Sequence, residues 1–246
     1  MPISLDMRRT IPAVLAVAFV VLIIIAVLAW PVSSPRNDSM YQKGTLDDLM
    51  KGEYDGTMKV PDLLRHGDVG LGTFHGLNGE MVVLEGVCYQ VTSDGTVNVV
   101  GGDMSTPFAC VAYFQQDYAH PIVAGLNYSQ MQTGLASVMA DSDVFVFFII
   151  HMTLPEITVR SVPAANEPYP ALPEMIANQT IFQLTNVTGT LVGIYSPSFI
   201  GQIDSAGFHF HFISDDRSSG GHVLDLTTGT ATAEMDEKRT MELSLN

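Results

Sequence analysis

The sequence predicts an α+β fold of two packed halves, built from mostly antiparallel or mixed β-sheets with few helices. Short apolar or alternating segments of strand length recur along the chain. Turn-forming pairs such as Asn78-Gly79 and Asp94-Gly95 separate them, whereas helical spacing is confined to a few short stretches. A crossing at 164–173 contains three prolines. We therefore expect an N-terminal half at 40–165 and a C-terminal half at 166–246.

The first 39 residues differ in composition from the rest of the chain. Residues 11–30 carry no charged side chain, and Arg8 and Arg9 precede them. As a helix, such a run is about 30 Å long, enough to cross the hydrocarbon core of a bilayer. Positive charge before the run predicts that the N-terminus stays inside. We expect a transmembrane signal anchor and linker over 1–39, with the rest membrane-anchored outside the cytoplasm, or exported if the helix is cleaved.

The N-terminal half begins with two short helical patterns and continues as a meander of strands. Leu46, Leu49 and Met50 form one apolar helical face that Gly52 can end, and Pro61 fits the first turn of a second helix. The expected helices lie within 40–52 and 60–66, and the expected strands cover 69–74, 80–86, 87–92, 97–100 and 108–114.

The remaining elements follow the same rules. A helix is expected where apolar residues stand near helical spacing, and a central strand where the chain is continuously apolar. Charged side chains gather at 234–239 after a Gly-Thr turn, where we expect a solvated hairpin end. These rules predict helices at 128–140 and 173–177 and strands at 144–153, 157–163, 182–195, 208–212, 222–226 and 240–245.

Charge and cysteine content limit the partners. The formal net charge is −15, so no nucleic-acid partner is expected, because phosphate binding needs clustered Lys and Arg. Hydrophobic residues make up 47% of the chain, enough for a sizeable core. Cys88 and Cys110 lie in apolar, strand-like segments, as two buried thiols or one disulfide.

Three histidines near the C-terminal end have the spacing of a metal site. His209 and His211 are two residues apart in a Phe-rich strand and point to the same face, while the Phe side chains point to the other. The turn-rich stretch 213–221 leads to His222, so a hairpin would return it beside the pair. Three converging neutral imidazoles are typical of a catalytic divalent metal site, most often zinc. The alternative is two solvent-facing strand histidines and a third that follows a turn by chance.

Arg160 is the charged residue of the alternating segment 157–163. It shares a face with Thr158 and Val162. From spacing alone, it is equally an edge-strand arginine in solvent or a functional residue.

Several longer motifs stand in order along the chain. They are Gly70-Leu71-Gly72-Thr73-Phe74, Leu77-Asn78-Gly79-Glu80-Met81, Tyr89-Gln90, Thr106-Pro107-Phe108, Arg160-Ser161-Val162-Pro163, Pro168-Tyr169-Pro170 and Phe182. The most specific is His209-Phe210-His211-Phe212-Ile213-Ser214-Asp215-Asp216-Arg217, followed by Gly220-Gly221-His222-Val223-Leu224-Asp225. With these motifs, the chain resembles the α-acetolactate decarboxylase family from about Tyr41 to about Leu245.

The resemblance implies a zinc-dependent carboxy-lyase of the acetoin and butanediol pathway, usually a homodimer. Such an enzyme converts the hydroxy-keto acid (S)-2-acetolactate into (R)-acetoin and CO2. Carried over by position, the resemblance implies catalytic roles for Glu80 and Arg160, substrate binding by Arg160, and a place for Thr73 in the same pocket. The implied zinc ligands are His209, His211 and His222.

One departure from the family bears on activity. Members continue into a largely helical tail that returns a second glutamate to the metal, whereas this sequence stops at Asn246. The nearby carboxylates most simply face solvent, and they are Glu234, Asp236, Glu237 and Glu242. The rival function is therefore a metal-bound domain that binds a small hydroxy-keto acid with weak or no turnover. A metal hydrolase is a further alternative, for which the sequence shows no separate nucleophile and base.

Overall fold

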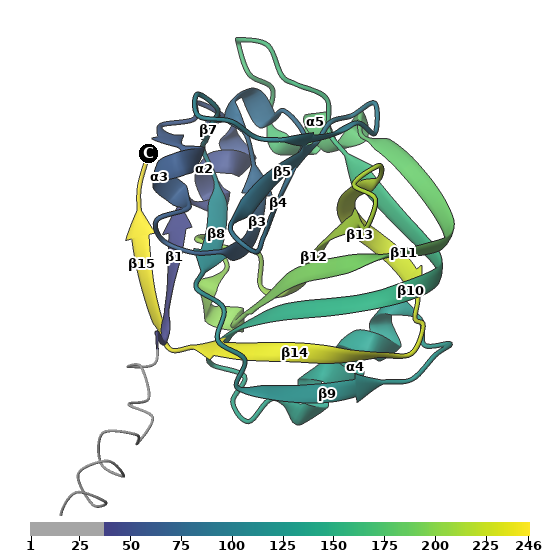
Figure 1. The fold of residues 1–246 in the computed structure, drawn as a ribbon. Helices are drawn as coiled ribbons and strands as arrows, with labels where there is room; N and C mark the ends of the chain where they lie inside the picture. Colours follow the sequence, from purple (N-terminus) through teal and green to yellow (C-terminus); the bar gives the residue numbers. More distant parts are fainter. Residues whose placement is uncertain (1–36) are drawn as a thin grey trace, which may run out of the picture. The chain divides into compact units, whose positions relative to one another are not determined.

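The computed structural model describes residues 37–246, which form two large β-sheets and one two-stranded pair, with few and short helices (Figure 1). This agrees with the predominance of strand over helix expected from the sequence. The signal anchor predicted for 1–39 depends on residues 11–30, which lie outside the described residues. Within 37–246, no helix combines the length and the apolar character needed to cross a bilayer.

The first sheet has seven strands in the order β15-β1-β8-β3-β4-β5-β6. Neighbours run antiparallel, except that β15 pairs with β1 in parallel. Glu85 and Gly86 join β4 to β5 with positive φ at both residues, the conformation that a tight two-residue hairpin turn requires. The bounds are β1 Ser39–Lys43, β3 Val69–Thr73, β4 Glu80–Leu84, β5 Val87–Val91, β6 Val97–Val99, β8 Ala109–Ala112 and β15 Thr240–Ser244.

The helices are short, and α2 and α3 carry the two end signals noted in the sequence, Gly52 and Pro61. The side chain of Thr45 accepts a hydrogen bond from the Asp48 N–H at the start of α2, and Gly52 ends that helix in the left-handed conformation. Pro61 lies in the first turn of α3. The bounds are α2 Leu46–Lys51, α3 Val60–Leu63, α4 Tyr128–Val138 and α5 Leu172–Ala177, with 3-10 turns η1 at His75–Leu77 and η2 at Ser198–Ile200.

The second sheet has six strands in the order β11-β12-β13-β10-β14-β9, and four of them close into a ring. One edge of β10 pairs with β11 along its length, and the other edge pairs first with β14 and then with β13. Because β12 joins β11 to β13, the ring β10-β11-β12-β13 is complete. The bounds are β9 Tyr118–Ile122, β10 Phe145–Ser161, β11 Thr180–Ser196, β12 Gly207–Ser214, β13 Gly220–Thr227 and β14 Ala231–Lys238, and the separate pair is β2 Met58–Lys59 with β7 Ser105–Thr106.

Strand β10 is a single strand, whereas the sequence predicted separate strands at 144–153 and 157–163. Pro155, which has no N–H to donate to a ladder, lies in the gap between the two predicted strands. In the structure Pro155 lies between the section of β10 that pairs with β14, which ends at Ile150, and the section that pairs with β13, which begins at Glu156. The β11 register on the other edge also leaves Pro155 without a partner, so neither ladder requires its N–H and the strand continues through it.

The two sheets do not divide the chain at the expected boundary between residues 165 and 166. Strands β9 and β10 precede this boundary but belong to the second sheet. Strand β15 is the last strand within residues 37–246, yet it returns to the first sheet beside β1 (Figure 1). The proline-rich crossing therefore connects β10 to α5 and β11, not one sheet to the other.

The charge-rich stretch 234–239 is the clearest correction to the sequence prediction of a solvated hairpin end. It lies mostly in β14, between β10 and β9, and both Asp236 and Lys238 are 0% exposed. The Lys238 Nζ lies 2.7 Å from the Asp236 Oδ2 and also donates to the carbonyl oxygens of Asn37 and Tyr113. Mutual pairing permits this burial, and a spacing rule based on charge alone does not detect it.

The buried apolar residues of the described chain form three clusters, one of which packs α3 with strands of the first sheet. One apolar cluster joins residues of both sheets, such as Leu71 and Val82 with Val192 and Ile213. A second gathers Phe148, Phe210 and Phe212 with apolar residues of β13 and α4. Cys88 and Cys110 are separate buried thiols, which decides between the two alternatives left by the sequence.

Candidate functional site

The three histidines come together on one face of the β12–β13 hairpin. His211 lies directly opposite His222 in the register of the two strands. His209 precedes His211 by two residues and therefore points to the same side. The intervening Phe210 and the following Phe212 are 0% exposed and point into the core on the other side. The hairpin expected from the sequence is present, with its Phe and His faces separated as predicted.

Three ring nitrogens converge on one point. His209 Nε2 lies 3.1 Å from His211 Nε2 and 2.9 Å from His222 Nδ1, and the remaining separation is 3.3 Å. Tetrahedral ligands at typical zinc–nitrogen distances of about 2.0–2.1 Å would be roughly 3.3–3.4 Å apart. The nitrogens are thus close to the spacing that a bound metal requires, and these residues form a group able to hold a metal ion.

Hydrogen bonding and burial favour the metal-binding form of these rings. The Nδ1–H of His211 donates to the Met81 carbonyl at 2.7 Å, which leaves its Nε2 lone pair facing the other two rings. Burial, with a smaller contribution from Arg160, lowers the pKa of His209 to about 4. Burial and then the neighbouring His209 lower the pKa values of His211 and His222 well below the usual range. Neutral imidazoles facing one another offer their lone pairs to a cation.

Arg160 and Glu80 form a buried ion pair beside the histidines. Arg160 lies opposite His222 in the β10–β13 register, and its Nη1 donates to Glu80 Oε1 at 2.8 Å. The other carboxyl oxygen of Glu80 is 3.5 Å from His211 Nε2. Burial raises the pKa of Glu80, and the Arg160 guanidinium opposes this change. Arg160 is therefore not an edge-strand arginine in solvent, because its side chain is only 14% exposed.

Thr73 lies next to this pair. It is opposite Glu80 in the β3–β4 register and is 4% exposed. Its hydroxyl donates to the Gly79 carbonyl at 2.8 Å, which ties the end of β3 to the turn before β4. This bond fixes the strand that presents Glu80.

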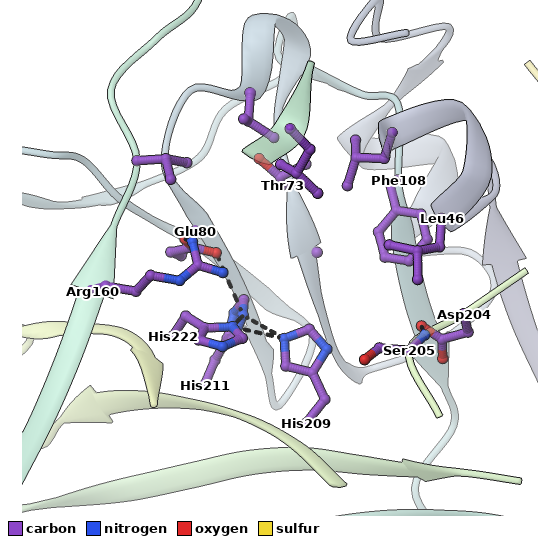
Figure 2. A pocket seen from close by; sticks show the side chains of 15 residues that line it. Leu46, Thr73, Glu80, Phe108, Arg160, Asp204, Ser205, His209, His211 and His222 are labelled. Carbon is purple, nitrogen blue, oxygen red and sulfur yellow. Dashed lines mark hydrogen bonds and ion pairs between the residues drawn. The ribbon is translucent and has the colours of Figure 1, made fainter. Parts of the chain in front are cut away.

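A cavity of ≈ 140 Å³ opens above the histidines, and its lining includes the residues to which the family resemblance gave site roles: Thr73, Glu80, Arg160, His209, His211 and His222. The cavity is smaller than the roughly 300–1,000 Å³ typical of sites for drug-sized ligands, so it suits a small molecule. Figure 2 shows Arg160 and Glu80 on one side of the imidazoles and Asp204 and Ser205 on the other. The remaining wall is largely apolar, and its residues are Leu46 and Leu49 of α2, Gly72, Leu77, Phe108, Val162 and Leu172.

Sequence reasoning missed Asp204 and the apolar wall. Asp204 lies in an irregular loop without a motif, and leucines on short helices give no functional signal. Within residues 37–246, the cavity lining includes none of the carboxylates weighed from the C-terminal stretch, which are Glu234, Asp236, Glu237 and Glu242. Glu242 is exposed on β15, which agrees with its expected solvent face.

Comparison with known proteins identifies the family. The family model described as alpha-acetolactate decarboxylase matches residues 40–246. The chain belongs to the α-acetolactate decarboxylase family. An alpha-acetolactate decarboxylase from Methanosarcina mazei is 38% identical over 83% of this chain and 71% of its own length, and one from Bacillus licheniformis is 33% identical over 85% and 82%. The family resemblance noted in the sequence is confirmed, and this is a family of carboxy-lyases.

Solved structures of α-acetolactate decarboxylases share the fold. The crystal structure of the protein from Bacillus subtilis strain 168 superposes with a TM-score of 0.82 and 32% identity, covering 84% of this chain and 88% of the other. A Staphylococcus aureus protein described as similar to the family gives the same score at 29% identity. The mostly β-sheet fold with few helices, expected from the sequence, is that of the family.

Proposed function

We propose that this protein decarboxylates (S)-2-acetolactate to (R)-acetoin and CO2, with zinc held by His209, His211 and His222. The observation that carries the proposal is the convergence of three neutral imidazoles beside the Arg160–Glu80 pair, in one small cavity. Family membership supplies the reaction. A bound zinc ion would act there as a Lewis acid toward the oxygen that gains negative charge when CO2 leaves.

Arg160 is the anchor for the substrate carboxylate in this proposal. A guanidinium has five N–H donors in a planar fork, and the bond to Glu80 occupies one of them. The remaining donors suit a two-point contact with a carboxylate. The apolar wall, with Leu46 and Leu49 of α2, offers contact surface for the two methyl groups.

Glu80 handles protons next to the reacting carbon. Its carboxyl is 6% exposed and lies between the guanidinium and His211. Burial favours its neutral form and Arg160 favours its charged form, so small changes at the site shift its protonation. Such a group can accept or return a proton, and it can also contribute an oxygen ligand to the metal.

The proposal extends to assembly and location. We infer a homodimer, as the resemblance implies, and attachment to a membrane through residues 11–30 with the domain outside the cytoplasm. The rival function keeps the metal and the cavity but has weak or no turnover, so that the protein binds a small hydroxy-keto acid. Both functions need the same site, and only turnover separates them.

The test is acetoin production by the full-length protein. Purified in detergent and loaded with zinc, it should convert racemic acetolactate to acetoin, and chelation should abolish the reaction. Chiral chromatography should show mainly (R)-acetoin. Stoichiometric binding of the substrate without acetoin formation would favour the binding domain and overturn the enzyme proposal.

A further inference from the structure

A second carboxyl group, that of Asp204, lies in the cavity wall away from Glu80. Asp204 follows η2 in the loop that leads into β12, and Figure 2 shows it on the opposite side of His209 from Arg160. The residue is 1% exposed, which is comparable with two other cavity-lining residues, His211 at 1% and Glu80 at 5%. The cavity thus has one acidic group on each side of the imidazoles.

The contacts of Asp204 are with neutral groups. Its Oδ2 accepts a hydrogen bond from the Ser196 hydroxyl at 2.6 Å and lies 3.7 Å from the Cys110 thiol, while its Oδ1 accepts from the Ser205 N–H at 2.7 Å. Behind this group, the Cys110 thiol also lies 3.4 Å from Gln42 Oε1. The ion pairs found within residues 37–246 do not include Asp204.

Burial raises the pKa of Asp204, although the hydrogen bonds from Ser196, Ser205 and Cys110 oppose the change. Glu80 differs because a guanidinium stands beside it and favours its charged form. The charged and titratable groups across the cavity are Glu80, Arg160 and the three histidines, and Cys110 is the titratable group in contact. Two carboxyl groups in such different surroundings divide the acid and base roles between them.

The reaction needs a proton donor. Cleavage of the carbon–carboxylate bond releases CO2 and leaves its electron pair in an enediolate. One proton must then add to the carbon that lost CO2, so each turnover consumes one proton. A single enantiomer forms only if a positioned group delivers the proton from one side.

We propose, on the basis of the proposed function, that the Asp204 carboxyl is the acid that protonates the enediolate carbon. The Asp204 O–H bond breaks as the carbon–hydrogen bond forms, which leaves an aspartate carboxylate. Ser196 and the Ser205 N–H stabilise that carboxylate, and a proton from water restores the acid before the next turnover. Glu80 and Arg160 hold the other side of the substrate, so the proton arrives from the face opposite to them.

The test replaces Asp204 by asparagine, which keeps the size and an acceptor oxygen but removes the acidic proton. Zinc-loaded Asp204→Asn should lose roughly 10²–10⁴-fold in kcat with KM within a few-fold of the wild type. The acetoin that this variant still forms should be nearly racemic, because water then protonates the enediolate carbon from either face. Unchanged kcat and enantiomeric purity at normal zinc content would overturn the proposal. Wild-type protein that forms no acetoin would instead refute the proposed function itself.

A matched control separates proton donation from support of the loop. Ser196→Ala removes one hydrogen bond to the same carboxyl but keeps its proton, so (R)-acetoin should remain in excess. Infrared spectroscopy of the resting wild type should show a protonated carboxyl band that shifts in Ser196→Ala, even if Asp204→Asn does not fold. A racemic product from Ser196→Ala, or no such band at the pH of the assay, would contradict the assignment.

Discussion

Arg160 donates a hydrogen bond from Nη1 to Glu80 Oε1 at 2.8 Å, joining the penultimate residue of β10 to the first residue of β4. The two residues are 80 positions apart and belong to different sheets. Their side chains are 14% and 6% exposed, so the bond spans the junction between the sheets out of contact with most solvent. The same bond leaves the rest of the guanidinium fork facing the cavity.

The geometry of the guanidinium, beyond its charge, should therefore be needed for activity. We expect Arg160→Lys to fall within about tenfold of Arg160→Ala, each losing roughly 10²–10³ in kcat/KM, because lysine cannot make a planar two-point contact. Steady-state kinetics with acetolactate measure this. Arg65→Lys, on a side chain that is 78% exposed, serves as the control and should behave as wild type. Wild-type kinetics in Arg160→Lys would show that charge alone is sufficient.

The metal site should require all three histidines. His222→Ala should lower zinc affinity by more than the roughly 10–100-fold that loss of an outer partner of a ligand typically costs, and turnover should disappear. Zinc content after dialysis, measured by atomic absorption, tests this directly. His151→Ala, in β10 with its side chain 59% exposed, should keep full occupancy. Full zinc occupancy in His222→Ala would disprove the ligand set.

Gly193 should be needed because Phe210 packs where a side chain would stand. The two residues are opposite each other in the β11–β12 register, and a Cβ at Gly193 would overlap the Phe210 ring. Gly193→Ala should cost about 1–3 kcal/mol of unfolding free energy. Zinc affinity should fall as well, because Phe210 separates His209 from His211.

Urea unfolding and zinc titration measure these two effects of Gly193→Ala. The control is Gly134→Ala in α4, where an added Cβ meets nothing within 4 Å. That change should raise stability by about 0.5–1 kcal/mol, because alanine suits a helix better than glycine. Equal stability of the two variants would mean that Phe210 moves away from the Cβ added by Gly193→Ala at no cost in free energy.

The buried pair of Asp236 and Lys238 should matter more than a surface pair. Asp236→Ala removes the carboxylate 2.7 Å from a lysine that is 0% exposed, and should cost about 3–5 kcal/mol of unfolding free energy. Asp47→Ala breaks the exposed pair with Lys51 and should cost at most about 1 kcal/mol. Urea denaturation compares the two variants. A loss below 1 kcal/mol in Asp236→Ala would show that Lys238 finds compensation elsewhere.

Local signals in the sequence were sufficient for much of the fold and for the histidine site. Alternation places His209 and His211 on one face and Phe210 on the other, and this depends only on strand geometry. Gly52 and Pro61 likewise mark helix ends through their own backbone preferences. These features depend only on residues close together in the sequence, so they can be predicted from the sequence alone.

Features that depend on partners far away in the sequence could not be predicted from local patterns. Strand β14 looked like a solvated end because its partners, β9 and β10, lie far away in sequence. The burial of Lys238 depends on carbonyl oxygens of Asn37 and Tyr113, which no spacing rule connects to it. Asp204 reaches the cavity through the course of an irregular loop. Its position follows from where β11 ends and β12 begins.

The parallel pairing of β15 with β1 has a consequence for how the protein is made. Ser39 pairs with Thr240 and Lys43 with Ser244. Strand β1, the first strand of the described residues, therefore cannot complete its pairing before β15 is present. During synthesis, the outer edge of β1 stays unpaired until β15 has also left the ribosome. The ring that carries the histidines ends at β13 and can close earlier. Completion of the seven-stranded sheet is therefore a late event. Until then, the unpaired outer edge of β1 is the place where the nascent chain is most exposed to wrong strand pairing.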